Sequence, residues 1–137
     1  MDALDHLHHD LRTAHPELRV FEGLVDQDRC LDLELTPTRF LLGQLREWRA
    51  GIVVHARLGR LTDEVRLMRE ALSLNADQAT RHEPIYALDE AGLLCRYRLP
   101  FAQVHAHTLV QQLQRVAEQH RAWLEAGWLL SEAQELC

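Results

Sequence analysis

Nine histidines in a chain of 137 residues are the side chains best suited to chemistry, since histidine ligates metals and transfers protons. His6 and His9 share one face of a helical first segment, and His8 lies between them on another face. His105 and His107 are two residues apart, so a helix places them on different faces. A helical zinc motif needs two histidines four residues apart with a glutamate between them, and no pair here has that spacing. The spacing therefore predicts no metal site and no cofactor, although a site assembled from distant segments stays open.

Other candidate catalytic groups are equally isolated. Serine occurs only at Ser73 and Ser131, outside any glycine-flanked nucleophile turn, and the six glycines form no phosphate loop. Cys30, Cys95 and Cys137 are far apart and odd in number, which favours reduced thiols, two of them in strands, over a disulfide or a zinc set. We assign no catalytic residue and expect no enzyme; a small α+β enzyme with a dispersed histidine site is the alternative.

Charge and composition narrow the class of partner. All 15 basic residues are arginine, against 21 acidic residues, and the net charge is −6. Without a basic cluster, the chain lacks the electrostatic footprint of a nucleic-acid binder or of a protein held on an anionic membrane. No apolar run approaches the roughly 20 residues that span a bilayer, and the N-terminus has no signal-peptide pattern. We expect a cytoplasmic protein of one domain, residues 1–137, whose partner is another protein.

The first half of the chain is expected to supply one helix and three strands. Apolar residues at helical spacing predict a helix that ends before Pro16: Leu4, Leu7 and Leu11. A short connection follows, and strict alternation then predicts a half-buried strand over residues 30–36, with three leucines on its inner face: Leu31, Leu33 and Leu35. Residues 39–48 suit either a second strand or a helix, and the β-branched run at 52–57 favours a third strand.

The second half is expected to hold two helices around a hairpin. The helix at about 63–75 carries two apolar stripes, one of Leu61, Val65, Met68 and Leu72, the other of Leu67, Ala71 and Leu74. One stripe suffices to pack on a sheet, so the second is a candidate interface. A hairpin over 83–100 and a long helix over 101–126 follow, and residues 127–137 form a further helix or a tail. The predicted fold is α+β, with a twisted antiparallel sheet of about five strands, three helices over one face, and the order α-β-β-β-α-β-β-α.

This order of segments resembles the class I chaperones of bacterial type III secretion, the Tir-chaperone-like family. The resemblance is clearest over residues 51–126. It includes a leucine-rich helix that ends near Asn75, a short strand, the turn Asp89-Glu90-Ala91-Gly92 and a strand that ends at Leu99-Pro100. A long amphipathic helix with Trp123 near its end completes the pattern.

The resemblance implies a homodimer in the bacterial cytoplasm that binds the N-terminal region of one cognate effector in extended form, without ATP, and keeps it soluble and ready for secretion. We place the effector site on the first helix and first strand: Leu4, Leu7, Leu11, Leu31, Leu33 and Leu35. The alternative is that these leucines fill the core. The dimer interface is expected to include Leu67, Ala71, Leu74, Ile85 and Ala87.

The identity of the partner is not encoded in the chain. A large cytotoxic enzyme such as a patatin-like phospholipase is one guess for the effector. A regulatory protein on the same scaffold, which sequesters a transcription regulator, is a further alternative to the chaperone.

Overall fold

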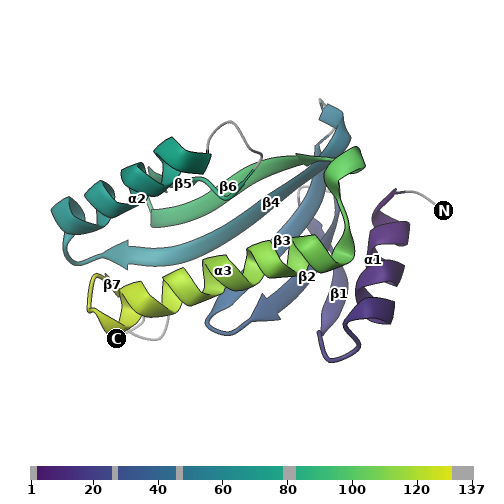
Figure 1. Cartoon of the computed structure of the whole chain (residues 1–137), viewed down its shortest axis with the longest axis horizontal. Helices are drawn as coiled ribbons and strands as arrows, with labels where there is room; N and C mark the ends of the chain where they lie inside the picture. Colours follow the sequence, from purple (N-terminus) through teal and green to yellow (C-terminus); the bar gives the residue numbers. More distant parts are fainter. Residues whose placement is uncertain (1–2, 26–27, 46–47, 79–82, 131–137) are drawn as a thin grey trace.

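Three helices and seven strands make up the fold in the computed structural model, which describes residues 3–25, 28–45, 48–78 and 83–130 (Figure 1). The elements follow the chain as α1 (Ala3–Ala14), β1 (Val20–Val25), β2 (Asp28–Leu35), β3 (Thr38–Leu45), β4 (Trp48–Leu61), α2 (Glu64–Gln78), β5 (Tyr86–Asp89), β6 (Gly92–Pro100), a 3-10 turn (Phe101–Gln103), α3 (Ala106–Glu125) and β7 (Leu129–Leu130).

The strands form one antiparallel sheet in the order β1-β2-β3-β4-β6-β5, so β1 and β5 are its two edges. Strand β7 pairs with the end of β4, where Leu129 opposes Leu61. The predicted α+β class, with three helices and an antiparallel sheet, is confirmed. The predicted number of about five strands is too small, because β1 and β7 were not recognised.

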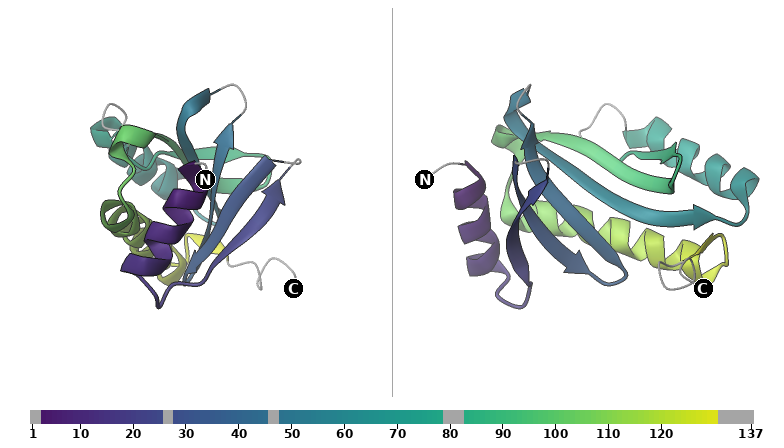
Figure 2. Two further views of the ribbon diagram at one scale, coloured as in Figure 1. Left: turned by 90° about the vertical axis from the view of Figure 1, so that its right-hand side faces the viewer. Right: turned by 180° about the vertical axis from the view of Figure 1, so that it is seen from behind.

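All three helices pack on the same face of the sheet, and no helix of the described residues lies on the opposite face (Figure 2, left). One core joins the inner side of the strands to the helices, and its largest fully buried side chains are Trp123, Phe40, Leu11, Leu31, Leu33, Leu42, Ile52, Leu67, Leu93, Leu109, Leu113 and Leu129. None of the helices in the described part of the chain is long and apolar enough to cross a membrane.

The burial of their side chains explains which strands could be predicted from the sequence pattern. In β2, Leu31 and Leu33 are buried and the intervening Asp32 is not, as alternation predicts. Strand β1 shows no such pattern, because most of its residues are exposed on both faces of a sheet edge. Residues 38–45 are strand β3, which resolves the choice between strand and helix there. Leu129 and Leu130 are strand rather than helix or tail, and residues 131–137 lie outside the described part.

A buried histidine fastens α3 to the middle of the sheet. His120 donates from Nε2 to the carbonyl oxygen of Leu58 at 2.7 Å, because a carbonyl can only accept. Its Nδ1 is therefore the unprotonated nitrogen, which accepts a hydrogen bond of 2.7 Å from the hydroxyl of Thr38. Burial lowers the pKa of His120, so the neutral ring is the form that the fold holds.

The sequence of the turn between β5 and β6 is explained by the hydrogen bonds of Asp89 and by the close backbone contact of Gly92. The carboxylate of Asp89 accepts a hydrogen bond of 2.8 Å from the Ala91 amide and pairs with Arg57 on β4, and the pKa of Asp89 falls to about 2. The Arg57 bond is the larger cause of that shift and the Ala91 bond the second. Gly92 has a φ of 126°, and a Cβ there would lie 2.3 Å from the Gly59 carbonyl oxygen. The turn motif is thus structural.

Candidate protein-binding surfaces

The six leucines predicted to bind an effector lie together where α1 meets β2. Within one chain, five of them are buried in the core and Leu35 is half-buried against it. The surface that these leucines leave to a partner is therefore small. A direct contact between them and an effector stays a prediction, and their observed role is to hold α1 on the sheet.

The residues predicted to form a dimer interface lie on α2 and around β5. Leu67 and Ala71 face the sheet and are buried, Leu74 and Ile85 are half-buried, and Ala87 is exposed. The other stripe of α2 is the one left open, since Val65 and Leu72 have exposed fractions of 70% and 59%. Contacts with a second chain stay a prediction for all five residues.

One residue in the sequence, Asn75, indicates which of the two stripes of α2 faces the sheet. Asn75 shares the helix face of Ala71 and Leu67, four and eight residues earlier. Its side-chain oxygen accepts a hydrogen bond of 2.8 Å from the Tyr86 amide, and its side-chain nitrogen donates one of 2.7 Å to the Tyr86 carbonyl oxygen. An asparagine that binds a strand's backbone marks the stripe that faces the sheet.

Exposed apolar side chains gather at the two edges of the sheet. On β1 they are Phe21, Leu24 and Val25, with exposed fractions of 62%, 72% and 46%, and we call these three residues the β1 patch. Strand β1 has a hydrogen-bonded neighbour strand on one side only within the described residues. The combination of open backbone and apolar side chains is typical of a strand that accepts another chain. The sequence pattern missed this surface altogether.

The second group lies at the opposite edge. It consists of Val65 and Leu72 on α2 together with Leu88 on β5, and we call it the α2 patch. Here the backbone of the edge strand is partly covered, because Asn75 binds both polar groups of Tyr86. The Tyr86 ring also meets buried Trp123 edge to face, with ring centroids 5.1 Å apart. The α2 patch is thus a side-chain surface rather than an open strand.

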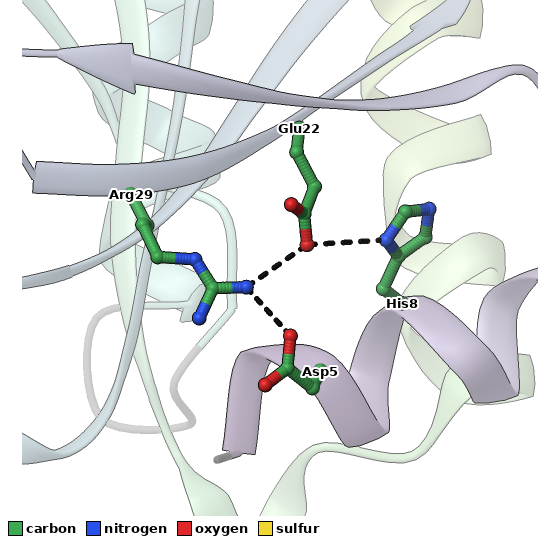
Figure 3. A network of polar contacts seen from close by, with 4 residues as sticks. All are labelled: Asp5, His8, Glu22 and Arg29. Carbon is green, nitrogen blue, oxygen red and sulfur yellow. Dashed lines mark hydrogen bonds and ion pairs between the residues drawn. The ribbon is translucent and has the colours of Figure 1, made fainter. Parts of the chain in front are cut away.

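Four charged or polar side chains hold α1 against the β1 edge (Figure 3). Nη2 of Arg29 lies 2.6 Å from Oδ1 of Asp5 on α1 and 2.9 Å from Oε1 of Glu22 on β1. Nδ1 of His8 lies 3.6 Å from the same glutamate oxygen. The groups are partly exposed, so the network adds little to stability and mainly fixes the position of α1 beside the β1 patch.

The histidines and cysteines form no metal-binding cluster among the described residues. The rings of His15 and His107 stack at a centroid distance of 5.8 Å between the end of α1 and the start of α3. Cys30 and Cys95 are free, buried thiols in strands, as predicted, and burial raises the pKa of Cys95 to about 12. Such thiols are inert at neutral pH.

The fold and its two apolar edges define a protein-binding module. A family model described as "Tir chaperone protein (CesT) family" matches residues 21–124, which is most of the chain. The chain belongs to this family: it is a type III secretion chaperone and not an enzyme. A comparison with curated proteins finds none that matches.

Proposed function

We propose that the chain works as a homodimer that binds the N-terminal segment of one cognate effector in extended form and keeps it competent for secretion. The observation that carries the proposal is the β1 edge, where the outer backbone of the strand has no partner strand among the described residues and lies beside three exposed apolar side chains. An extended peptide that adds to this edge gains backbone hydrogen bonds along the strand and apolar contacts on both faces.

The side chains of β1 offer such a segment apolar contacts on both faces of the strand. Opposed residues in neighbouring strands point to the same face, so Phe21 and Val25 point away from the helices while Leu24 points to the helix side. Leu24 therefore lies on the same face as α1, which the ion pairs of Arg29 hold in place. We infer that the predicted leucines of α1 and β2 act mainly as the support of this surface, with half-buried Leu35 as the one that has surface left for contact.

The second copy is proposed to dock at the other edge of the sheet. The apolar region around α2 and β5 has two sides: the α2 patch and half-buried Leu74 lie on the helix side. Exposed Ala87 points to the opposite face, because it opposes Leu94 and not the core residue Leu93. A symmetric dimer would pair this region with itself and leave the two β1 edges free for cargo. Buried Leu67 and Ala71 would then support the interface from behind.

Two aspartate variants test whether the β1 edge binds cargo and the edge formed by α2 and β5 forms the dimer. The chain is co-expressed with the product of a neighbouring gene, since chaperones of this kind are usually encoded beside their cargo. Capture is measured on tagged cargo, and the oligomeric state is measured by light scattering. We expect Leu24→Asp to remain a dimer that captures no cargo, and Leu72→Asp to become a monomer, because an unpaired charge in an apolar contact is costly.

Each variant serves as the control for the other, since both replace an exposed leucine by aspartate. Unchanged capture by Leu24→Asp would refute the β1 site, and an unchanged dimer in Leu72→Asp would refute the α2 interface. Recovery of a transcription regulator instead of an exported protein would favour the regulatory alternative. The cytoplasmic location and the patatin-like phospholipase as cargo stay predictions.

A further inference from the structure

A hollow next to the β1 edge lies on the face of the sheet that points away from the three helices. The hollow measures 300 Å³, and an apolar floor of Cys30, Leu41, Gly43 and Val53 lies at its centre. Val25 of the β1 patch, Asp28, Arg29, Gln44, His55 and Arg96 complete its lining. A cavity of about 150 Å³ already holds a benzene ring, so this hollow has room for an aliphatic or aromatic side chain.

Two glycines keep the floor of the hollow low. Gly23, Cys30 and Gly43 lie directly opposite one another on β1, β2 and β3, and Val53 continues the row on β4. A Cβ built at Gly43 would meet nothing nearer than the Cβ of Cys30, at 3.8 Å. The backbone therefore does not require glycine at this position, and its missing side chain leaves open space above the sheet.

Arg96 gives one side of the hollow a positive charge, although the whole chain carries a net charge of −6. Asp28 and Arg29 also line the hollow, and Arg29 is engaged by Asp5 and Glu22. His55 lies directly opposite Arg96 in neighbouring strands. Burial first, and then the charges of Arg57 and Arg96, lower the pKa of His55. Arg57 is engaged by Asp89, whereas Arg96 makes no side-chain ion pair within the part of the chain that is described. A guanidinium in this position suits a carboxylate, which it can bind through two hydrogen bonds.

We propose that this hollow is a second subsite for the cargo segment, and that it takes an apolar side chain followed two residues later by an aspartate or glutamate that pairs with Arg96. The inference rests on the proposed function and names the chemistry of the segment. Leu41 and Arg96 are two strands apart, about 10 Å. Two residues of extended chain cover about 7 Å and keep both side chains on one face, and the long side chains of arginine and glutamate span the remainder. Val25 belongs to both surfaces, so a segment on the β1 edge continues into the hollow.

Two variants and a matched control test the subsite on the dimer with its co-purified cargo fragment. Gly43→Leu fills the hollow, and Arg96→Glu reverses the charge on the Arg96 side of its rim. Arg115→Glu makes the same charge change at an exposed position of α3, which packs on the opposite side of the sheet from the hollow. By isothermal titration, we expect each subsite variant to weaken cargo binding about tenfold, because Arg96→Glu loses a charge-assisted bond and Gly43→Leu excludes an apolar side chain from the hollow. Arg115→Glu should bind like the wild type.

The outcomes separate this inference from the proposed function. Cargo binding that is abolished by Leu24→Asp but unchanged in both subsite variants would overturn the subsite and leave the β1 site standing. A loss in Arg115→Glu equal to that in Arg96→Glu would also overturn it, because the effect would then come from net charge. A change of oligomeric state in Gly43→Leu would assign the hollow to a second copy of the chain instead.

A measurement on the chaperone alone decides the question even without cargo. The ring signals of His55 are followed by NMR during titration with the peptide acetyl-Leu-Ser-Glu-amide and with its glutamine counterpart. We expect saturable shifts with the glutamate peptide only, and their loss in Arg96→Glu. The absence of shifts, or equal shifts with both peptides, would refute the carboxylate subsite.

Discussion

The two edges of the sheet differ in whether the outward-facing backbone groups of the edge strand have hydrogen-bond partners. At the β5 edge, Asn75 of α2 binds both the amide and the carbonyl of Tyr86, and Trp123 packs against the ring of the same residue. At the β1 edge, α1 is held beside the strand by ion pairs, and the outer backbone of the strand has no partner strand among the described residues. A closed edge suits contact between folded surfaces, whereas an open edge suits an unfolded segment that supplies its own strand.

The largest expected effect is on the closed edge, where a substitution in the buried stripe of α2 should unfold the chain. Leu67 is fully buried, so Leu67→Asp places an unpaired charge in the core and should cost at least about 4 kcal/mol of unfolding free energy. Leu72→Asp, on the exposed stripe of the same helix, should change the unfolding free energy of the monomer by less than about 0.5 kcal/mol. Urea denaturation followed by circular dichroism measures both. Similar losses in the two variants would contradict the assignment of the stripes.

The next effect concerns the asparagine that closes the β5 edge. Asn75→Ala leaves the amide and carbonyl of Tyr86 without these two partners, which should cost about 2 kcal/mol. Hydrogen exchange should then accelerate at the Tyr86 amide and not in β1. Thr108→Ala removes a side-chain bond near the exposed start of α3 and serves as the control. Unchanged exchange at Tyr86 would show that Asn75 does not close this edge.

A smaller effect is expected in the middle of the sheet, between the two edges. Burial lowers the folded-state pKa of His120, so below the unfolded-state value near 6.5 the unfolded chain binds a proton that the folded chain does not. Stability is therefore complete above that pH and falls as the pH decreases, by at most about 1.4 kcal/mol per pH unit from this residue. Denaturation at pH 7.5 and 5.5 should show a smaller decrease in His120→Gln, which cannot titrate. An equal decrease in both proteins would exclude His120 as a source.

The smallest effect should come from the ion pairs at the open edge. Arg29→Gln removes contacts between partly exposed groups, so the unfolding free energy should fall by no more than about 1 kcal/mol. The position of α1 should change more than the stability, with faster hydrogen exchange in α1 alone. Arg12→Gln, at the exposed end of the same helix, is the matched control. A loss of several kcal/mol would show that these ion pairs carry the fold at the open edge.

The sequence predicts an element well where one of its faces is buried. The alternating leucines of β2, the hairpin of β5 and β6, and the long helix α3 all follow from a periodic core-facing side. Strand β1 could not be found in this way, because an edge that exposes apolar side chains on both faces has no period of two. The proposed cargo site lies on that strand. The exposure of apolar side chains on both of its faces suits the strand for binding and also prevents its prediction from periodicity.

The stripes of α2 illustrate a different limit. Both stripes have helical spacing, so periodicity alone cannot tell which of them faces the sheet. The decisive residue is the polar Asn75, which binds the backbone of Tyr86 on β5, eleven residues later in the sequence. The two-stripe pattern correctly indicates that α2 has an unpartnered apolar side within one chain. The surface with open apolar area is, however, formed by Val65 and Leu72.

The open edge of β1 also has a consequence for the chaperone before it meets cargo. An unpaired strand with apolar side chains is a template on which further copies can stack into aggregates. The one charged side chain on β1, Glu22, is already engaged by Arg29 and His8, so its charge does little to repel another strand. Cargo would then protect the chaperone as much as the chaperone protects its cargo. Light scattering during storage should show slower aggregation of the co-expressed complex, and of Leu24→Asp, than of the wild-type chain expressed alone.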